Sequence, residues 1–301
     1  MFDDLSIYHR ERMVYMNYYD LAVARKSVRS FGNKKIPDKI RQEIEDYGKH
    51  CECLTPGTAV EWRFFDGDIL EQLSGCAGYH GFMVEAPCYM VLLTEEKEHC
   101  LENAGFAGED MVLKLVELGL GSCWITILDG EKLKEQLGII SDKQPAALIA
   151  YGYEKPELGT LRIDIKSPSN IHLKQRSGLI APKLYIEDAV YEGVWGQPSQ
   201  IDLWPRNSNL YRALIAACCA PTALNRQPFR FIMDGHQIYL VILKDEMTTQ
   251  ENEGLNTGIV MHHFAMVMTR QSGLHGTWNL QPEKKDLGLP EGAYVAGSFE
   301  I

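Results

Sequence analysis

Two short motifs occur twice along this chain, in the same order. WRFFDG at residues 62–67 is echoed by FRFIMDG at 229–235, and GLGSCW at 119–124 is echoed by GLHGTW at 273–278. In both halves the second motif follows a helical pattern, and an internal repeat of this kind limits the folds that the chain can adopt. We therefore predict a duplicated architecture, in which the two halves of the 301 residues form related units.

The spacing of apolar residues predicts long helices mixed with short buried strands. Apolar residues recur every three or four positions in residues 101–121, and a second long helix is expected near 254–272. Such a mixture is typical of an α+β layer around a sheet. The other expected elements are a short helix in 20–32 that passes into a basic turn, a helix at 36–51, strands at 59–67, 86–96, 122–127, 146–153, 275–281 and 293–301, and a helix, a loop and two strands joined by an Asp-Gly turn in 207–246.

Charge and hydropathy limit the partners of the chain. It carries 30 basic and 41 acidic residues, a net charge of −11, so its surface repels phosphate backbones and anionic lipids, and we expect neither nucleic acid nor membrane as a partner. No run approaches the roughly 18–20 apolar residues of a spanning helix, and the charged start does not resemble a signal peptide, which predicts a cytoplasmic protein. The eight cysteines are irregularly spaced, which predicts reduced thiols rather than a disulfide framework. Cys51 and Cys53 are separated by one residue, which is not the spacing of a zinc site, so no metal site is expected.

A basic segment, RKSVRSF at residues 25–31, is the first candidate binding motif. Arg25, Ser27 and Arg29 occupy alternate positions, and alternate side chains of an extended segment point to the same side. Two guanidinium groups and a hydroxyl can bind a phosphate or carbonyl oxygens directionally. A solvated basic turn is the alternative interpretation of this motif by itself.

A second candidate is the loop APTALNRQPF at residues 220–229, between a helix and a strand; we call it the amide loop. Its two prolines stiffen it, and Thr222, Asn225 and Gln227 offer hydroxyl and amide groups that can address the edge of a heterocycle. The alternative interpretation is a turn that caps the preceding helix.

Together the two motifs resemble those of the nitroreductase family. RKSVRSF matches the N-terminal RxSxR signature of that family, which binds FMN, and APTALNRQPF resembles its second signature, a Pro-Ser-rich loop ending in Asn-x-Gln-Pro-aromatic. In ordinary members both signatures lie within half of this length, and two subunits share two flavins. Here the first half has CECLTPGTAVEWRFF in place of the loop, and the second half has no RxSxR. The resemblance therefore implies a single-chain branch, a fused pseudo-dimer that keeps one complete flavin site.

The fold implied by this resemblance is α+β and nitroreductase-like, with two related lobes that mimic the usual homodimer. We expect an N-terminal lobe at residues 1–155 and a C-terminal lobe at 201–301. Residues 156–200 are rich in Pro, Gly and Ser with little periodicity, which predicts a crossover linker.

The resemblance also implies the FMN contacts. The basic segment would bind the phosphate, ribityl and pyrimidine parts, with Lys174 and Arg176 as a late basic pair at the phosphate, while Thr126 and Ile127 would place a backbone N–H near the flavin N5. The amide loop would cover the ring. The implied cofactor-binding residues are Arg25, Lys26, Ser27, Arg29, Thr126, Ile127, Lys174, Arg176, Pro221, Thr222, Ala223 and Asn225.

The implied activity needs no catalytic side chain, because the chemistry lies on FMN. NADH or NADPH would deliver hydride and leave, and a small acceptor such as a nitroaromatic or a quinone would take its place in a ping-pong cycle. Another flavin reaction on the same scaffold, such as dehalogenation or flavin fragmentation, and a non-catalytic flavin-binding protein are the alternatives. We expect a monomer, since a pseudo-dimer has its interface within one chain, and further dimerisation is left open.

Overall fold

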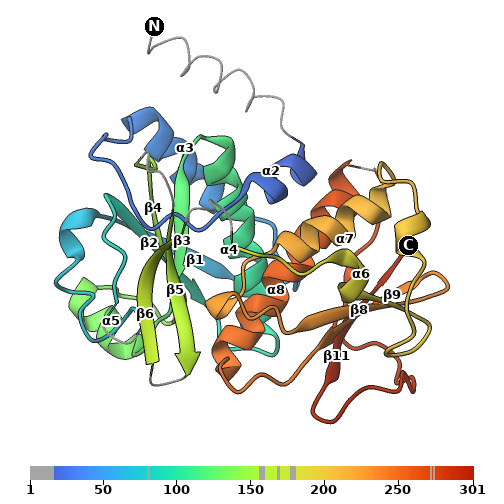
Figure 1. The fold of residues 1–301 in the computed structure, drawn as a ribbon. Helices are drawn as coiled ribbons and strands as arrows, with labels where there is room; N and C mark the ends of the chain where they lie inside the picture. The colour runs from blue at the N-terminus through green and yellow to red at the C-terminus, as the bar shows by residue number, and fades with distance from the viewer. Residues whose placement is uncertain are drawn as a thin grey trace, which may run out of the picture. The chain divides into compact units, whose positions relative to one another are not determined.

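The computed structural model describes residues 17–79, 82–155, 160–167, 170–176, 181–271, 273 and 275–301. The chain divides into two compact units (Figure 1). The first unit contains Ala24–Ala181, and the second combines Asn17–Val23 with Pro182–Ile301. Most of helix α2 (Tyr18–Ala24) therefore belongs to the second unit, whereas the basic segment that follows it belongs to the first.

The first unit is built on a four-stranded antiparallel sheet. Its elements are α3 (Asp38–Gly48), β1 (Val60–Asp66), η1 (Gly67–Ile69), β2 (Cys88–Thr94), α4 (Cys100–Glu117), β3 (Gly121–Ile125), α5 (Gly130–Leu137), β4 (Gln144–Gly152), β5 (Thr160–Ser167) and β6 (Asn170–Arg176). The strand order is β1-β2-β4-β3, and β5 and β6 form a separate antiparallel hairpin. β1 and β3 are therefore the edges of the sheet.

Apolar residues cover both faces of this sheet. Every residue of the central strand β2 is buried. Tyr89 and Val91 pack on one face in a cluster that includes Leu133 of α5. On β3, Trp124 approaches α4 at Gly108. Because both faces are covered, a further segment of the chain can join this sheet only at an edge strand, β1 or β3.

The second unit contains a five-stranded sheet in the order β10-β11-β9-β8-β7. Its elements are α2 (Tyr18–Ala24), α6 (Ile186–Ala189), β7 (Val190–Glu192), η2 (Ile201–Leu203), α7 (Asn209–Cys219), η3 (Ala223–Asn225), β8 (Phe229–Asp234), β9 (Gln237–Ile242), α8 (Gln250–Met266), the π-helical turn η4 (Val267–Gln271), β10 (Trp278–Asn279) and β11 (Tyr294–Glu300). Its core contains an aromatic cluster in which the ring of Phe264 on α8 lies 5.2 Å from Phe299 and 5.3 Å from Trp278.

Helix α2 is held to the second unit by its two tyrosines. Arg270 donates a hydrogen bond of 2.6 Å to the Tyr18 hydroxyl, and the backbone N–H of Tyr19 donates to the Gln271 side chain. The guanidinium of Arg212 on α7 lies over the Tyr19 ring. These contacts anchor the residues that immediately precede the basic segment.

The two units share their connectivity. In the first unit the antiparallel order is β1-β2-β4-β3, and in the second β8-β9-β11-β10 has the same order and the same antiparallel pairings. Helix α4 connects β2 to β3, as α8 connects β9 to β10. The repeated motifs fall on equivalent elements, because WRFFDG lies on β1 and FRFIMDG on β8. The predicted duplication is confirmed at the level of connectivity; the second unit adds β7, parallel to β8.

Several segments differ from their sequence patterns. Residues 156–200, expected as a linker with little periodicity, contain the β5–β6 hairpin in the first unit and α6 and β7 in the second. The helix expected near 254–272 begins earlier, at Gln250, because the Thr249 side chain caps it by accepting from the Asn252 N–H. The strand expected at 275–281 is reduced to Trp278–Asn279.

Helix α5 was absent from the sequence prediction. It is short and mostly polar, and its ends are defined by caps: the Asp129 carboxylate accepts from the Lys132 N–H, and Gly138 takes a left-handed conformation with φ of 62°. Within the described residues, no helix has the combination of length and apolar character that crossing a membrane requires.

Candidate functional site

The basic segment extends the first sheet at its β3 edge. Ser27 forms a parallel bridge with Ser122 of β3, and the Val28 N–H donates to the Ser122 carbonyl at 2.8 Å. Further along, Phe31 bridges with Glu154, just after β4. The extended conformation expected for this segment is therefore confirmed, and its backbone is fixed by pairing with the sheet.

The first arginine of the segment is buried against α4. The Arg25 Nε atom lies 3.5 Å from Glu109 Oε1, and the two side chains are 3% and 0% exposed. The other carboxylate oxygen of Glu109 accepts from the Trp124 indole N–H at 3.0 Å. Sequence reasoning did not single out Glu109, although an acidic residue within the apolar pattern of α4 was a usable signal.

The remaining polar residues of the segment are partly buried. The Lys26 Nζ atom pairs with Glu154 at 2.7 Å, and Arg29 donates to the Ser27 carbonyl at 3.5 Å. The alternation of the motif predicted that the side chains of Arg25, Ser27 and Arg29 lie on the same side of the segment. In the structure Arg25 is buried against α4, whereas Ser27 and Arg29 are partly exposed. Carboxylates thus face both Arg25 and Lys26.

Two glycines permit the close packing around this segment. A Cβ at Gly121 would lie 2.5 Å from Val28 Cγ2, and a Cβ at Gly108 would lie 2.4 Å from the ring of Trp124. Both distances are far below an ordinary carbon–carbon contact. Glycine at 121 therefore lets the basic segment lie against β3, and glycine at 108 lets Trp124 reach Glu109.

Thr126 and Ile127 follow directly after β3 and leave its regular pairing. Ile127 forms an antiparallel bridge with Ala77, and the flanking N–H of Gly78 donates to the Thr126 carbonyl at 2.9 Å. This pattern marks Ala77 and Ile127 as a non-hydrogen-bonded pair, in which each residue turns its own N–H away from the other. The Ile127 N–H consequently points to the opposite side of the strand from Ala77.

In the second unit, the amide loop has a strained backbone. Leu224, Asn225 and Gln227 have positive φ values of 54°, 56° and 54°. Left-handed conformations of residues other than glycine cost about 1–3 kcal/mol each and persist only where surrounding contacts enforce them. Such clusters are found preferentially at ligand sites and switch regions, which favours a binding role for this loop.

Hydrogen bonds from the side chains of the loop help to hold its left-handed backbone. The Thr222 hydroxyl accepts from the Gln227 N–H at 2.9 Å, and the Gln227 carbonyl oxygen Oε1 accepts from the Leu184 N–H at 2.6 Å. The Asn225 amide donates to the Pro182 carbonyl at 2.9 Å and accepts from Lys183 Nζ at 3.3 Å. The polar groups of Thr222, Asn225 and Gln227 therefore make bonds within the unit, a role that the sequence did not indicate.

Asn256 on α8 contacts the backbone of the amide loop, and the sequence did not indicate this role. Its Oδ1 atom accepts from the Ala223 N–H at 2.9 Å. The residue is 6% exposed, and within the described residues its Nδ2 atom is buried without a hydrogen-bond partner. A buried donor left unsatisfied costs about 1–3 kcal/mol, so this group is unusual beside a strained loop.

The far end of the loop is anchored by an ion pair. Arg226 donates to both carboxylate oxygens of Asp245, at 3.0–3.2 Å, and the Thr248 hydroxyl donates to the same carboxylate at 2.6 Å. Burial acts to raise the pKa of Asp245, but the hydrogen bonds from Arg226, Thr248 and the Met247 N–H outweigh it and hold the pKa below its ordinary value. Asp245 is therefore ionised wherever the protein is folded near neutral pH.

The late basic pair predicted to bind the phosphate belongs to the β5–β6 hairpin. Lys174 and Arg176 lie on β6, paired with Arg162 and Thr160, but their side chains lie outside what the structure describes. Their proposed contact with a phosphate stays a prediction.

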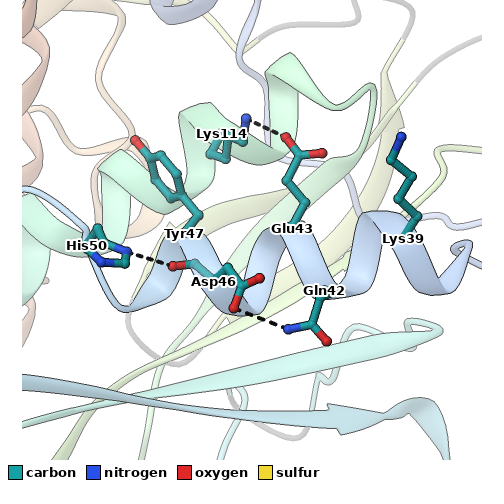
Figure 2. Close-up of a pocket in the computed structure, with 7 residues that line it drawn as sticks. All are labelled: Lys39, Gln42, Glu43, Asp46, Tyr47, His50 and Lys114. Carbon is teal, nitrogen blue, oxygen red and sulfur yellow. Dashed lines mark hydrogen bonds and ion pairs between the residues drawn. The ribbon is translucent and has the colours of Figure 1, made fainter.

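A surface hollow lies elsewhere in the first unit, between α3 and α4 (Figure 2). Lys114 of α4 pairs with Glu43 of α3 at 2.8 Å and lies over the ring of Tyr47. Asp46 accepts from Gln42, and its carbonyl contacts the His50 ring, as Figure 2 shows. None of the predicted cofactor-binding residues lines this hollow.

The family of the chain follows from a comparison with family models. Residues 17–180, more than half of the chain, match the model described as "Putative TM nitroreductase". The match includes the basic segment, its Ser122 partner and the strand that leads to Thr126 and Ile127. The chain belongs to the nitroreductase family.

Individual relatives agree with this placement. A protein of Archaeoglobus fulgidus named "Putative NADH dehydrogenase/NAD(P)H nitroreductase" is 25% identical over 164 residues, which cover 49% of this chain and 92% of the relative. A protein of the same name from Methanothermobacter thermautotrophicus is 21% identical over 175 residues, covering 53% of this chain and 88% of the relative. Both relatives are thus much shorter than this chain and correspond to about half of it.

One solved structure resembles nearly the whole chain. The crystal structure titled as a putative nitroreductase from Thermotoga maritima has a TM-score of 0.58 and 17% identity, covering 95% of this chain and 93% of its own. At this identity the likeness concerns the fold alone. It confirms the predicted α+β, nitroreductase-like fold over both units.

Proposed function

We propose that this protein is an FMN-dependent NAD(P)H oxidoreductase that reduces a small acceptor, such as a nitroaromatic or a quinone. The observation that carries the proposal is the basic segment, an RxSxR motif fixed by pairing with Ser122 at the edge of β3. Membership of the nitroreductase family and the names of the two archaeal relatives support it.

The donor chemistry of the described residues fits FMN. A phosphate and a polar ring edge require guanidinium, hydroxyl, amide and backbone N–H groups, and the two units contain these at the basic segment, after β3 and in the amide loop. The buried Nδ2 atom of Asn256, which has no hydrogen-bond partner among the described residues, adds a donor beside that loop. The proposed FMN contacts are Arg25, Lys26, Ser27, Arg29, Thr126, Ile127, Lys174, Arg176, Pro221, Thr222, Ala223 and Asn225.

FMN, when bound, would supply the two-electron chemistry. The residues of the chain would then bind, orient and stabilise. Ser27 and Arg29 would hold anionic and polar oxygens, while the Ile127 N–H would stabilise negative charge without the involvement of a side chain. NADH or NADPH and the acceptor would occupy the same place in turn, which is a ping-pong cycle and requires no side-chain nucleophile.

We further propose that the chain is a fused pseudo-dimer with one flavin site, functional as a monomer. The N-terminal lobe would span residues 1–155, the crossover 156–200 and the C-terminal lobe 201–301. The shared connectivity of the two sheets supports this proposal, as do relatives that correspond to half of the chain. The RxSxR motif is present in one half and the amide loop in the other, so two complete sites cannot be assembled from these motifs.

Anaerobic reduction tests the activity. The FMN-loaded protein is mixed with NADH or with NADPH, and loss of flavin absorbance near 450 nm is expected with at least one of them, on the order of 1 s⁻¹ or faster. Addition of a nitroaromatic or a quinone should then restore the oxidised spectrum. A flavin that is bound in full but stays oxidised with both donors would contradict the enzyme and favour a flavin-binding protein.

A further inference from the structure

Glu109 places a carboxylate in the interior of the first unit. It lies on α4 and is 0% exposed, and burial of an isolated carboxylate is strongly unfavourable unless it is paired and hydrogen-bonded. Its two oxygens meet partners from two other elements: Arg25 of the basic segment at 3.5 Å and the Trp124 indole of β3 at 3.0 Å. Glu109 is thus the point at which a helix, a strand and the basic segment are joined.

The packing leaves Arg25 little freedom to turn elsewhere. Gly108 precedes Glu109 and gives the Trp124 ring the space to approach α4. Three residues after Arg25, the basic segment is pinned to β3 by the Val28 N–H. With its backbone fixed nearby and its Nε atom 3.5 Å from Glu109 Oε1, the Arg25 side chain is held in an ion pair with that carboxylate.

The neighbouring residue Asp110 provides a matched comparison. It is also buried, at 1% exposed, and also ionisable, but it faces α3. Its Oδ2 atom accepts from the Tyr47 hydroxyl at 3.0 Å and from the Glu52 N–H at 2.9 Å. Two adjacent carboxylates on one helix therefore serve different neighbours, and the hydrogen bonds of Asp110 to Tyr47 and Glu52 lie outside the basic segment.

We propose that Glu109 is a positioning residue of the flavin site, which acts through Arg25. The inference rests on the proposed function, because it assigns Glu109 the task of orienting one of the proposed FMN contacts. Glu109 itself would not touch the cofactor. Its charge keeps the Arg25 guanidinium ordered, and its second oxygen keeps Trp124 and β3 in register with the segment.

The test is a double-mutant cycle on FMN affinity, measured by quenching of flavin fluorescence for the wild type, Glu109→Gln, Arg25→Gln, the double variant and Asp110→Asn. We expect Glu109→Gln to weaken FMN binding roughly tenfold, the effect of losing one charge-assisted contact. If Glu109 acts through Arg25, the double variant binds FMN no more weakly than Arg25→Gln. Asp110→Asn should stay within about twofold of the wild type.

Additive losses in the double variant, or equal losses in Glu109→Gln and Asp110→Asn, would overturn the inference. A wild type that does not bind FMN would instead overturn the proposed function. Removing one member of a buried pair can prevent folding, so thermal melting is measured in parallel. If Glu109→Gln does not fold, the double variant, which lacks both charges, should melt higher than either single variant; a double variant that melts lower than Arg25→Gln would reject the coupling.

Discussion

Gly121→Ala tests whether the pairing of the basic segment with β3 is needed for flavin binding. The new Cβ would lie 2.5 Å from Val28 Cγ2, 2.9 Å from its Cβ and 3.1 Å from its Cγ1. Ordinary carbon contacts are about 3.5–4.0 Å, so the overlap is about 1 Å. Val28 is 4% exposed and all its branches are too close, so a change of rotamer cannot relieve the clash. The segment itself must move away from β3.

The displacement of the basic segment sets the expected losses of stability and of FMN affinity. Overpacking of this kind costs about 1–3 kcal/mol, and the Val28 to Ser122 hydrogen bond of 2.8 Å, worth about 1 kcal/mol, is strained or lost. Binding constellations tolerate displacements of about 0.5 Å, so a shift of about 1 Å should weaken FMN binding by tenfold or more. Fluorescence titration with FMN and thermal melting measure the two effects.

Two variants make this result interpretable. Val28→Ala in the Gly121→Ala background removes the two clashing methyl groups, including the closest contact at 2.5 Å, and keeps only the Cβ at 2.9 Å, so it should recover part of the lost FMN affinity. Gly130→Ala on α5 is the control, because its Cβ would meet only Pro145, at an ordinary 3.5 Å. Wild-type FMN affinity in Gly121→Ala, or no recovery in the double variant, would refute the reasoning.

The remaining predictions concern stability and thiol chemistry. Asp245→Asn should lower the free energy of unfolding by about 1–2 kcal/mol at pH 7, because the carboxylate is 8% exposed and bound by Arg226, which is itself half-exposed. The pKa of Asp245 is lowered in the folded state, so the stabilisation from its carboxylate is complete above the unfolded pKa of about 3.9 and is lost as the pH falls through the folded pKa. Urea unfolding of the wild type and of Asp245→Asn should therefore give free energies of unfolding that converge at low pH. A difference that stays constant with pH would argue against this ion pair. Burial raises the pKa of the Cys51, Cys53 and Cys218 thiols, but of these three only Cys53 is exposed, so a thiol reagent at pH 7 should label Cys53 first, as peptide mapping can show. Equally fast labelling of Cys218 in the folded protein would contradict its burial.

The sequence predicted those features that repeat or extend over many residues. The apolar run of β2 and the helical period of α4 placed the core of the first unit, and the two repeated motifs anticipated the shared order of the sheets. Short polar elements were missed, because α5 depends on its caps at Asp129 and Gly138 rather than on an apolar stripe. The β5–β6 hairpin was likewise hidden in a segment without clear periodicity.

The candidate site was predictable by residue type but not by contact. The motif RxSxR indicated an anion-binding segment, but the burial of Arg25 depends on Glu109, which lies more than eighty positions further along the chain. The left-handed conformation of Leu224 runs against its residue type, so only tertiary contacts can explain it. In the same loop, Asn225 and Gln227 turn their amides towards residues 182–184, a pairing that no local pattern reveals.

The most direct test of the proposed flavin site is the flavin content of the purified 301-residue chain. Flavin is released by heat, identified as FMN by chromatography and quantified against the chain concentration, after incubation with excess FMN and removal of the unbound fraction. We predict about one FMN per chain, since only one set of the two motifs is present. Two per chain would contradict the single-site pseudo-dimer, and no bound FMN would contradict the proposed flavin-dependent function.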